Sequence, residues 1–213
     1  MYGILSSQIY TDSDAALVGV FTTPLRISSE EPTRLATTLS YRSYSSTQRA
    51  HQWVVTADIA PSESGALFAV LLRSLLGVPL QVRMPQPVGS KAANSYSISG
   101  WQGSAEPWVY PATTVSIAGA QDAIGLDVGD FFTFTGALAG KVHVVRSKSI
   151  GTNPTVTFWP QTKKVANSGE APVSILSGNH CLMAAFLSPG AEPTLVHDQG
   201  LVHYPTLELL EIV

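Results

Sequence analysis

Charged residues and cysteine are scarce in this sequence. Asp, Glu, Lys and Arg make up 13% of its 213 residues, about half of the usual share in a soluble globular domain. So little charge is typical of a protein that covers much of its surface with partners, although abundant Ser and Thr can also solvate a surface. The single Cys181 excludes an internal disulfide and a zinc site built from several cysteines.

A basic balance, a targeting signal and a long apolar run are also missing. The net charge is −3, so the chain has no electrostatic footprint for phosphate backbones and we expect no sequence-specific nucleic-acid partner. The N-terminal residues show no secretory signal. The longest apolar stretch, residues 65–80, contains Arg73 and is too short to span a bilayer, so we expect no membrane insertion.

The first third of the chain combines predicted strands with an arm. Residues 18–28 predict an extended segment with a break at Pro24. Residues 33–50 are rich in Ser, Thr and Arg, which predicts an exposed strand or a long connecting arm. Residues 51–61 alternate apolar and polar side chains and predict a strand with one buried face. That face holds Trp53, Val55, Ala57 and Ile59.

A helix and another strand follow. Residues 62–77 predict a helix with Ser62 or Ser64 as its N-cap and Gly77 as its C-terminal stop. Its apolar stripe consists of Leu67, Phe68, Leu71, Leu72 and Leu75. Residues 79–84 predict a strand with Leu80, Val82 and Met84 on one face.

The middle of the chain predicts a small barrel. Residues 85–107 hold many turn formers and little periodicity, which indicates a crossing between domains. Five short strand candidates then follow, at 113–119, 131–134, 141–147, 155–160 and 172–177. Five strands of this spacing predict a partly open barrel of the OB type. Its candidate inward or seam positions are Phe132, Phe134, Val142, Val144, Val156 and Phe158.

The C-terminal part predicts two more strands, at residues 180–189 and 206–213, with a loop or hairpin between them. These strands need a sheet to join, and the strands at 51–61 and 79–84 lack partners of their own. We therefore expect the barrel to be an insertion, after which the chain returns to the first domain.

The search for catalytic or metal-binding residues finds weak patterns. His197, Asp198 and His203 suggest metal ligands or an acid–base pair, or else turn residues of a hairpin, which we favour because their spacing matches no metal motif. Cys181 suggests a nucleophile but fits a small core residue better. Asp127 and Asp130 suggest paired carboxylates but fit turn chemistry around Gly129 better. No catalytic, metal or cofactor residue is predicted, and we expect no enzyme.

Aromatic residues offer a different kind of site. Trp101 and Trp108 lie near Tyr96 and Tyr110 in the crossing segment. Such side chains stack on sugars or bases, or pack at domain seams and subunit interfaces, the use that we favour. Together with Trp159, the two tryptophans are the candidate glycan or interface residues.

The order of these elements resembles a known family. "FAVLLRSLLGVPLQVRMPQP", "ATTVSIAGAQDAIGLDVGDFFTF", "KVHVVRSKSIGTNPTVTFWP" and "LMAAFLSP" follow one another as in the distal tail protein of bacteriophages with long non-contractile tails, in the branch with an inserted OB-fold domain. The likeness covers residues 50–190. It implies a mainly β fold: a ring-forming β-sandwich or barrel domain with one α-helix at 1–87 and 182–213, and an inserted five-stranded OB-like barrel at 88–181.

The same resemblance implies a structural role in the virion. In that family six copies form a ring at the distal end of the tail, between the tail tube and the tip, hub, fibre or receptor-binding proteins, and DNA passes through the bore. The protein would be made in the host cytoplasm and carry no cofactor. The arm at 33–50 would reach a neighbouring copy. Two alternatives stay open: a module that binds a host-surface or cell-wall glycan, and a hydrolase that uses His197, Asp198 and His203.

Overall fold

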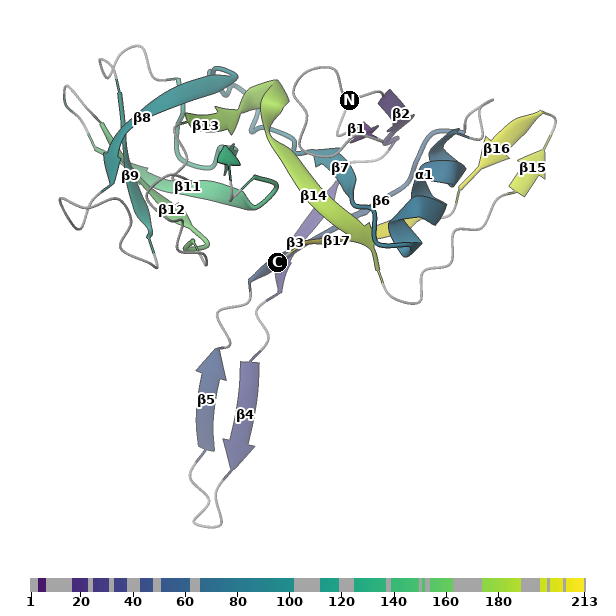
Figure 1. Ribbon diagram of the computed structural model, residues 1–213, viewed down its shortest axis with the longest axis horizontal. Helices are drawn as coiled ribbons and strands as arrows, with labels where there is room; N and C mark the ends of the chain where they lie inside the picture. The colour runs from purple at the N-terminus through teal and green to yellow at the C-terminus, as the bar shows by residue number, and fades with distance from the viewer. Residues whose placement is uncertain are drawn as a thin grey trace.

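The computed structural model has a mainly β fold with two antiparallel β structures and one helix in its described part (Figure 1). The described residues are 4–6, 17–22, 25–30, 33–37, 43–47, 51–61, 66–101, 112–118, 125–136, 139–149, 151, 154–162, 174–188, 196–198, 200–204 and 206–212. Pro24, Ser62, Ser64, Trp108 and Tyr110 lie outside them. No described helix has the length and apolar character needed to cross a membrane.

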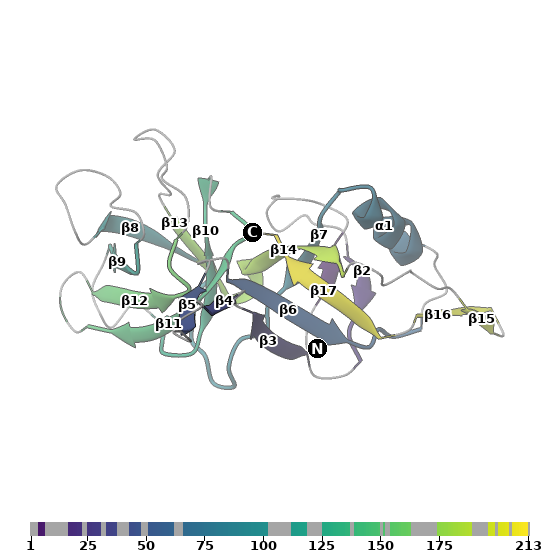
Figure 2. The same ribbon diagram turned by 90° about the horizontal axis from the view of Figure 1, so that it is seen from below.

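The first structure is a seven-stranded sheet in the order β2-β1-β7-β14-β17-β6-β3. Its strands are β1 (Ile4–Ser6), β2 (Leu17–Val20), β3 (Arg26–Glu30), β6 (Gln52–Ala57), β7 (Leu80–Arg83), β14 (Leu182–Leu187) and β17 (Leu207–Glu211). The sheet curls, because Phe21 forms a bridge with Ile59 and so joins the end of β2 to the segment after β6. Helix α1 (Ala66–Leu75) packs against β2, β7 and β14 (Figure 2).

The core of this sheet contains the residues predicted to face it, but Val54 and Gln81 on the opposite faces of their strands are buried as well, so the alternation is incomplete. All the residues assigned to the buried faces of 51–61 and 79–84 belong to one cluster with Leu67 and Leu71 of α1. The predicted helix stripe is too wide, because Leu72 and Leu75 are 42% and 51% exposed. The C-terminal strands join the sheet as expected, with β14 beside β7 and β17 beside β6. The domain boundaries at 87/88 and 181/182 stay a prediction.

The end of α1 forms a Schellman motif at Gly77, the residue predicted as its C-terminal stop. Gly77 has φ +85°, and the N–H groups of Gly77 and Val78 donate to the carbonyls of Ser74 and Arg73, both at 3.1 Å. Gly77→Ala is therefore expected to cost about 1 kcal/mol, because an L side chain is strained at this φ. Gly77→Asn should cost less, because Asn tolerates this conformation. Thermal unfolding of both variants tests this, and equal losses would contradict it.

The second structure is a closed antiparallel barrel in the order β10-β11-β12-β9-β8-β13. Its strands are β8 (Ser95–Trp101), β9 (Thr114–Ile117), β10 (Phe131–Phe134), β11 (Val142–Lys148), β12 (Thr155–Trp159) and β13 (Ser174–Ser177). Strands β10, β11 and β12 form a meander, and β9 pairs with β12, which is a Greek-key arrangement.

The prediction of five strands in a partly open barrel is wrong, because the barrel has six strands and is closed. The missed strand, β8, lies in the segment that we interpreted as a turn-rich crossing. Buried Tyr96 and half-buried Ile98 do alternate with exposed Ser95 and Ser97, but the serines and Gly100 give the segment little strand propensity. β8 forms because it pairs with β13 on one side and β9 on the other.

Of the six candidate inward or seam positions, some lie in the core of the barrel and the others at its contact with the sheet. Phe132, Phe134, Val156 and Phe158 are buried in the core of the barrel. Val142 is buried in the core of the sheet instead, and half-buried Val144 packs against it. One end of β11 therefore lies at the border between the barrel and the sheet.

Two hairpins complete the fold. Strands β4 (Thr33–Thr37) and β5 (Ser43–Thr47) pair with each other within the predicted arm and extend away from the sheet (Figure 1). Strands β15 (Val196–Asp198) and β16 (Leu201–His203) form a hairpin in the segment where a loop or hairpin was expected.

Candidate functional site

In the part of the chain that the structure describes, the residues suggested for catalysis are not brought together into one cluster. Asp198 is exposed and His203 half-buried on the β15–β16 hairpin, and the side chain of His197 is outside the described part. The described residues contain no group of three His, Cys, Asp or Glu suited to hold a metal ion. Cys181 is fully buried in the core of the sheet, and this burial raises the pKa of its thiol. It is the small core residue that we favoured.

The Asp127–Asp130 segment is a turn. The Asp130 N–H donates to the Asp127 carbonyl at 3.1 Å, and Gly129 between them has φ +93°. The Asp130 carboxylate is buried and accepts the Asp127 N–H at 2.7 Å. The Asp127 carboxylate accepts the Val128 N–H at 2.8 Å. Both carboxylates thus shape the entry into β10, as the turn interpretation predicts.

The aromatic candidates have different positions. Tyr96 is buried in the core of the barrel rather than at a seam, and its hydroxyl accepts the Ala93 N–H at 2.6 Å. Trp159 is half-buried at the border and packs against the core of the sheet. Trp101 ends β8, but its side chain is not described. Of the three tryptophans, the structure therefore locates the ring of Trp159 alone, and places it in an internal contact.

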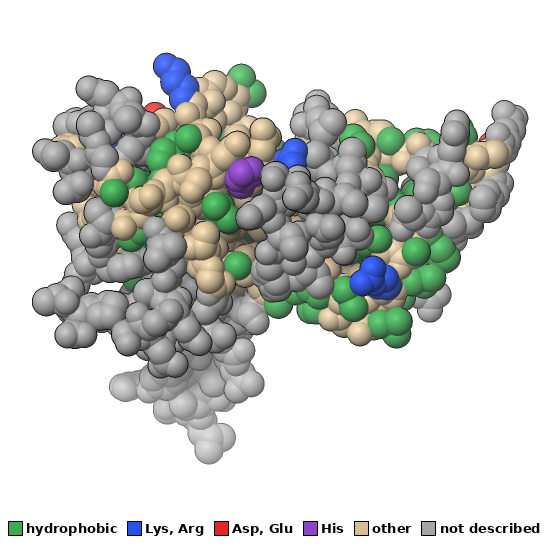
Figure 3. Space-filling model, turned by 45° about the horizontal axis from the view of Figure 1, so that its top comes forward, with side chains coloured by type: hydrophobic (Ala, Val, Ile, Leu, Met, Phe, Trp, Pro, Cys, Tyr) green, Lys and Arg blue, Asp and Glu red, His purple; other side chains and the backbone are tan. Residues whose placement is uncertain are grey.

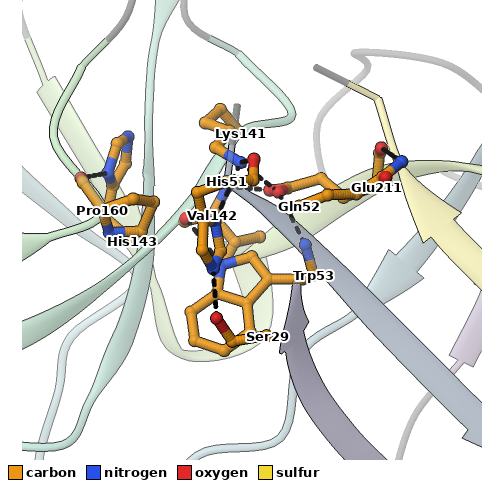
Figure 4. A network of polar contacts seen from close by, with 9 residues as sticks. All are labelled: Ser29, His51, Gln52, Trp53, Lys141, Val142, His143, Pro160 and Glu211. Carbon is orange, nitrogen blue, oxygen red and sulfur yellow. Dashed lines mark hydrogen bonds and ion pairs between the residues drawn. The ribbon is translucent and has the colours of Figure 1, made fainter. Parts of the chain in front are cut away.

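The most unusual group in the described part is a buried ion pair at this border, which sequence reasoning missed (Figure 4). Glu211, the last residue of β17, has no exposed side-chain surface. Its Oε1 accepts the Val142 N–H at 2.6 Å. Its Oε2 accepts the Trp53 N–H at 3.2 Å and a bond from Lys141 Nζ. The carboxylate is thus bound from the sheet by Trp53 and from the barrel by Lys141 and Val142.

The ammonium group of Lys141 is equally well satisfied. Besides Glu211, it donates to the His51 carbonyl at 2.7 Å and lies 3.3 Å from His51 Nδ1. An ammonium has three N–H donors and accepts none, so Nδ1 is the acceptor and the proton of this neutral ring is on Nε2. From there it donates to Ser29 Oγ, 3.1 Å away. One chain of bonds therefore runs from the barrel to edge strand β3.

Burial and pairing shift the pKa values of Lys141 and Glu211 in opposite directions. Burial lowers the pKa of Lys141 and raises the pKa of Glu211, while each charge favours ionisation of the other. The pair is enclosed by the two β structures and both of its members are fully used in hydrogen bonds. Its geometry suits holding two parts of a protein together rather than proton transfer to a substrate.

An aromatic cluster surrounds the pair. The ring of His51 meets the rings of Trp53 and Trp159 edge-on, with centroids 4.6 and 4.2 Å away. The indole N–H of Trp53 donates to the Val142 carbonyl at 2.9 Å, and its ring lies 5.7 Å from that of Phe131. The border thus combines an ion pair with apolar packing.

A second missed residue, His143, lies inside the barrel. Its centroid is 5.0–5.5 Å from those of Phe132, Phe134 and Phe158. Burial lowers its pKa to about 3, so the ring is neutral and its Nδ1–H donates to the Pro160 carbonyl at 2.7 Å. Nε2 has no hydrogen-bond partner in the described part. His143 is therefore a core residue whose burial lowers the stability of the folded protein as the pH falls.

No protein-family model and no curated protein matches this chain. A functional proposal therefore depends on the fold, the border and the composition.

Proposed function

We propose that the protein is a virion structural protein: a distal tail protein that forms a hexameric ring, joins the tail tube to the tail tip or receptor-binding apparatus, and lets DNA pass through its bore. In this proposal the curled seven-stranded sheet is the ring-forming domain. The small Greek-key barrel is the inserted OB-like domain. The observation that carries the proposal is the projecting β4–β5 arm.

The arm continues a strand pair of the sheet. Strands β3 and β6 pair from Arg26 opposite Thr56 to Glu30 opposite Gln52, and Thr33 opposite Thr47 begins the β4–β5 pairing. Two residues connect the strands on one side and four on the other. The ribbon thus reaches well beyond the sheet. A two-stranded hairpin is marginally stable by itself, which favours a partner surface for it.

The charge of the arm supports a second copy as that partner. Residues 33–50 contain Arg34, Arg42 and Arg49 but no Asp or Glu, so the arm carries +3. Because the whole chain carries −3, the remainder carries −6. A basic arm and an acidic body on each copy favour head-to-tail contacts, which generate closed rings or filaments. Charged side chains are also sparse over the described surface in Figure 3, as in a protein with extensive interfaces.

Charge reversal in the arm tests the proposal. The wild-type protein is expected to form six-membered rings in negative-stain images and by light scattering, alone or within the assembled particle. The variant Arg34→Glu/Arg42→Glu/Arg49→Glu should lose the ring, because like charges would then meet at the contact. Arg73→Glu, an exposed substitution on α1, is the control and should keep it.

Two results would overturn the proposal. One is a wild-type protein that stays monomeric at high concentration and is absent from the tail tip in images of the intact particle. The other is binding to a host cell-wall glycan by a monomer, lost in Trp101→Ala or Trp108→Ala, which would favour the glycan-binding alternative.

A further inference from the structure

The barrel and the sheet are joined covalently by a narrow neck. Residues 84–94 connect β7 to β8, and residues 178–181 connect β13 to β14. The two connections touch where the Met84 N–H donates to the Cys181 carbonyl at 2.9 Å. They also touch at the barrel end, where the Asn179 N–H donates to Asn94 Oδ1 at 3.1 Å. Two short connections do not by themselves fix the orientation of the barrel on the sheet, which therefore depends on further noncovalent contacts.

Those contacts gather on one end of the β10–β11 hairpin. The Gln86 side chain binds both backbone groups of Phe131, accepting from its N–H at 3.1 Å and donating to its carbonyl at 3.0 Å. Glu211 and the Trp53 indole bind both backbone groups of Val142 in the same manner. Side chains thus replace the neighbouring strand that these two residues lack on this side.

The ion pair exists only while the barrel is docked. Lys141 comes from the barrel, whereas its acceptors on Glu211 and His51 come from the sheet. After undocking, water would hydrate both charges. In the docked state each depends on the other, because one buried charge without its partner is far more costly than the intact pair.

We propose that Lys141, Glu211 and His51 form a latch that fixes the barrel on the sheet in one orientation, and that neutralising Glu211 lets the barrel swing about the neck while both β structures stay folded. Opening would uncover Trp53, Trp159 and Phe131. The latch does not depend on the ring proposal, because it acts within one chain.

Hydrogen exchange in Glu211→Gln tests the latch. The informative protons are the Trp53 indole N–H and the Ala184 amide, which donates from the sheet to the Gly140 carbonyl of the barrel at 3.0 Å, since neither is bonded to the carboxylate. Both are expected to exchange about tenfold faster or more, as in local opening. The Phe158 amide, bonded within the barrel to Thr113, and the Leu187 amide, bonded to Ser74, should keep their rates. Glu208→Gln, an exposed position on the same strand, is the matched control.

Tryptophan fluorescence provides a second measurement. Emission of Glu211→Gln should shift to the red and become easier to quench with acrylamide, because Trp53 and Trp159 gain contact with water. Unchanged exchange and emission would overturn the proposal. So would equal acceleration at all four protons, because the pair would then stabilise the whole fold rather than the docked orientation.

Discussion

Acidification from about pH 7 to about pH 4.5 should remove about 3 kcal/mol of stability through His143 alone. The folded-state pKa is about 3, against an ordinary value of 6.5. Between these values the unfolded chain binds a proton that the folded barrel does not accept. The contribution of neutral His143 to the free energy of unfolding is therefore fully present above pH 6.5. It is lost as the pH drops toward 3, where the loss would reach about 5 kcal/mol.

The matched variant is His143→Leu. It leaves the Pro160 carbonyl without its donor, so a loss of about 1–3 kcal/mol is expected at neutral pH. Its stability should then change less on acidification than that of the wild type, because the titrating group is gone. Urea unfolding at the two pH values measures the difference. His203→Leu, on the β15–β16 hairpin, should behave like the wild type. If acid destabilises wild type and His143→Leu equally, His143 is not the source.

His143 also shows where sequence patterns fail. On β11 it alternates with Val142 and Val144, so the pattern assigns those valines to the interior and the histidine to the surface. In the structure both faces of this end of the strand are covered. His143 faces the phenylalanines of the barrel, and Val142 enters the core of the sheet. The alternation of neighbouring residues cannot show that distant parts of the chain bury the second face of a strand.

The sequence contained a usable signal for Glu211 and His51. Glu211 shares the face of β17 with buried Leu207 and Leu209, and His51 precedes Trp53 and Val55 in the same alternation. A charged or polar residue on an apolar face indicates a buried partner. The partner itself could not be predicted, because Lys141 lies 70 residues from Glu211, at the start of the strand candidate at 141–147.

Much of the fold could be predicted because large apolar side chains mark its strands. Counting unpaired strands also predicted correctly that β14 and β17 return to the sheet that contains β6 and β7. β8 was missed because serine and glycine obscure its alternation, and its pairing partners, not its own residues, determine its structure. The arm was recognised by composition, whereas its pairing as a continuation of β3 and β6 became visible only in the structure.

Lys141→Met is expected to destabilise the docked state of the protein by about 3–5 kcal/mol near neutral pH, since it leaves the Glu211 carboxylate buried without a counter-charge while the barrel is docked. Removing Lys141 also removes the main influence that lowers the pKa of Glu211. That pKa should rise further, so the folded variant takes up a proton that the unfolded chain does not bind. Its deficit relative to wild type should therefore shrink as the pH falls, and His143 cancels in this comparison because both proteins contain it.

The double variant Lys141→Met/Glu211→Leu separates pairing from packing. With neither charge buried, most of the lost stability should return, because an apolar pair of similar volume often equals or exceeds a buried ion pair. The Val142 and Trp53 N–H groups lose their acceptor, so recovery should stop short of a full return by about 1–3 kcal/mol. Urea unfolding of wild type, both single variants and the double variant forms a complete cycle. Additive losses would mean that the two charges do not interact, and the barrel would then be held by Trp53 and its aromatic neighbours instead.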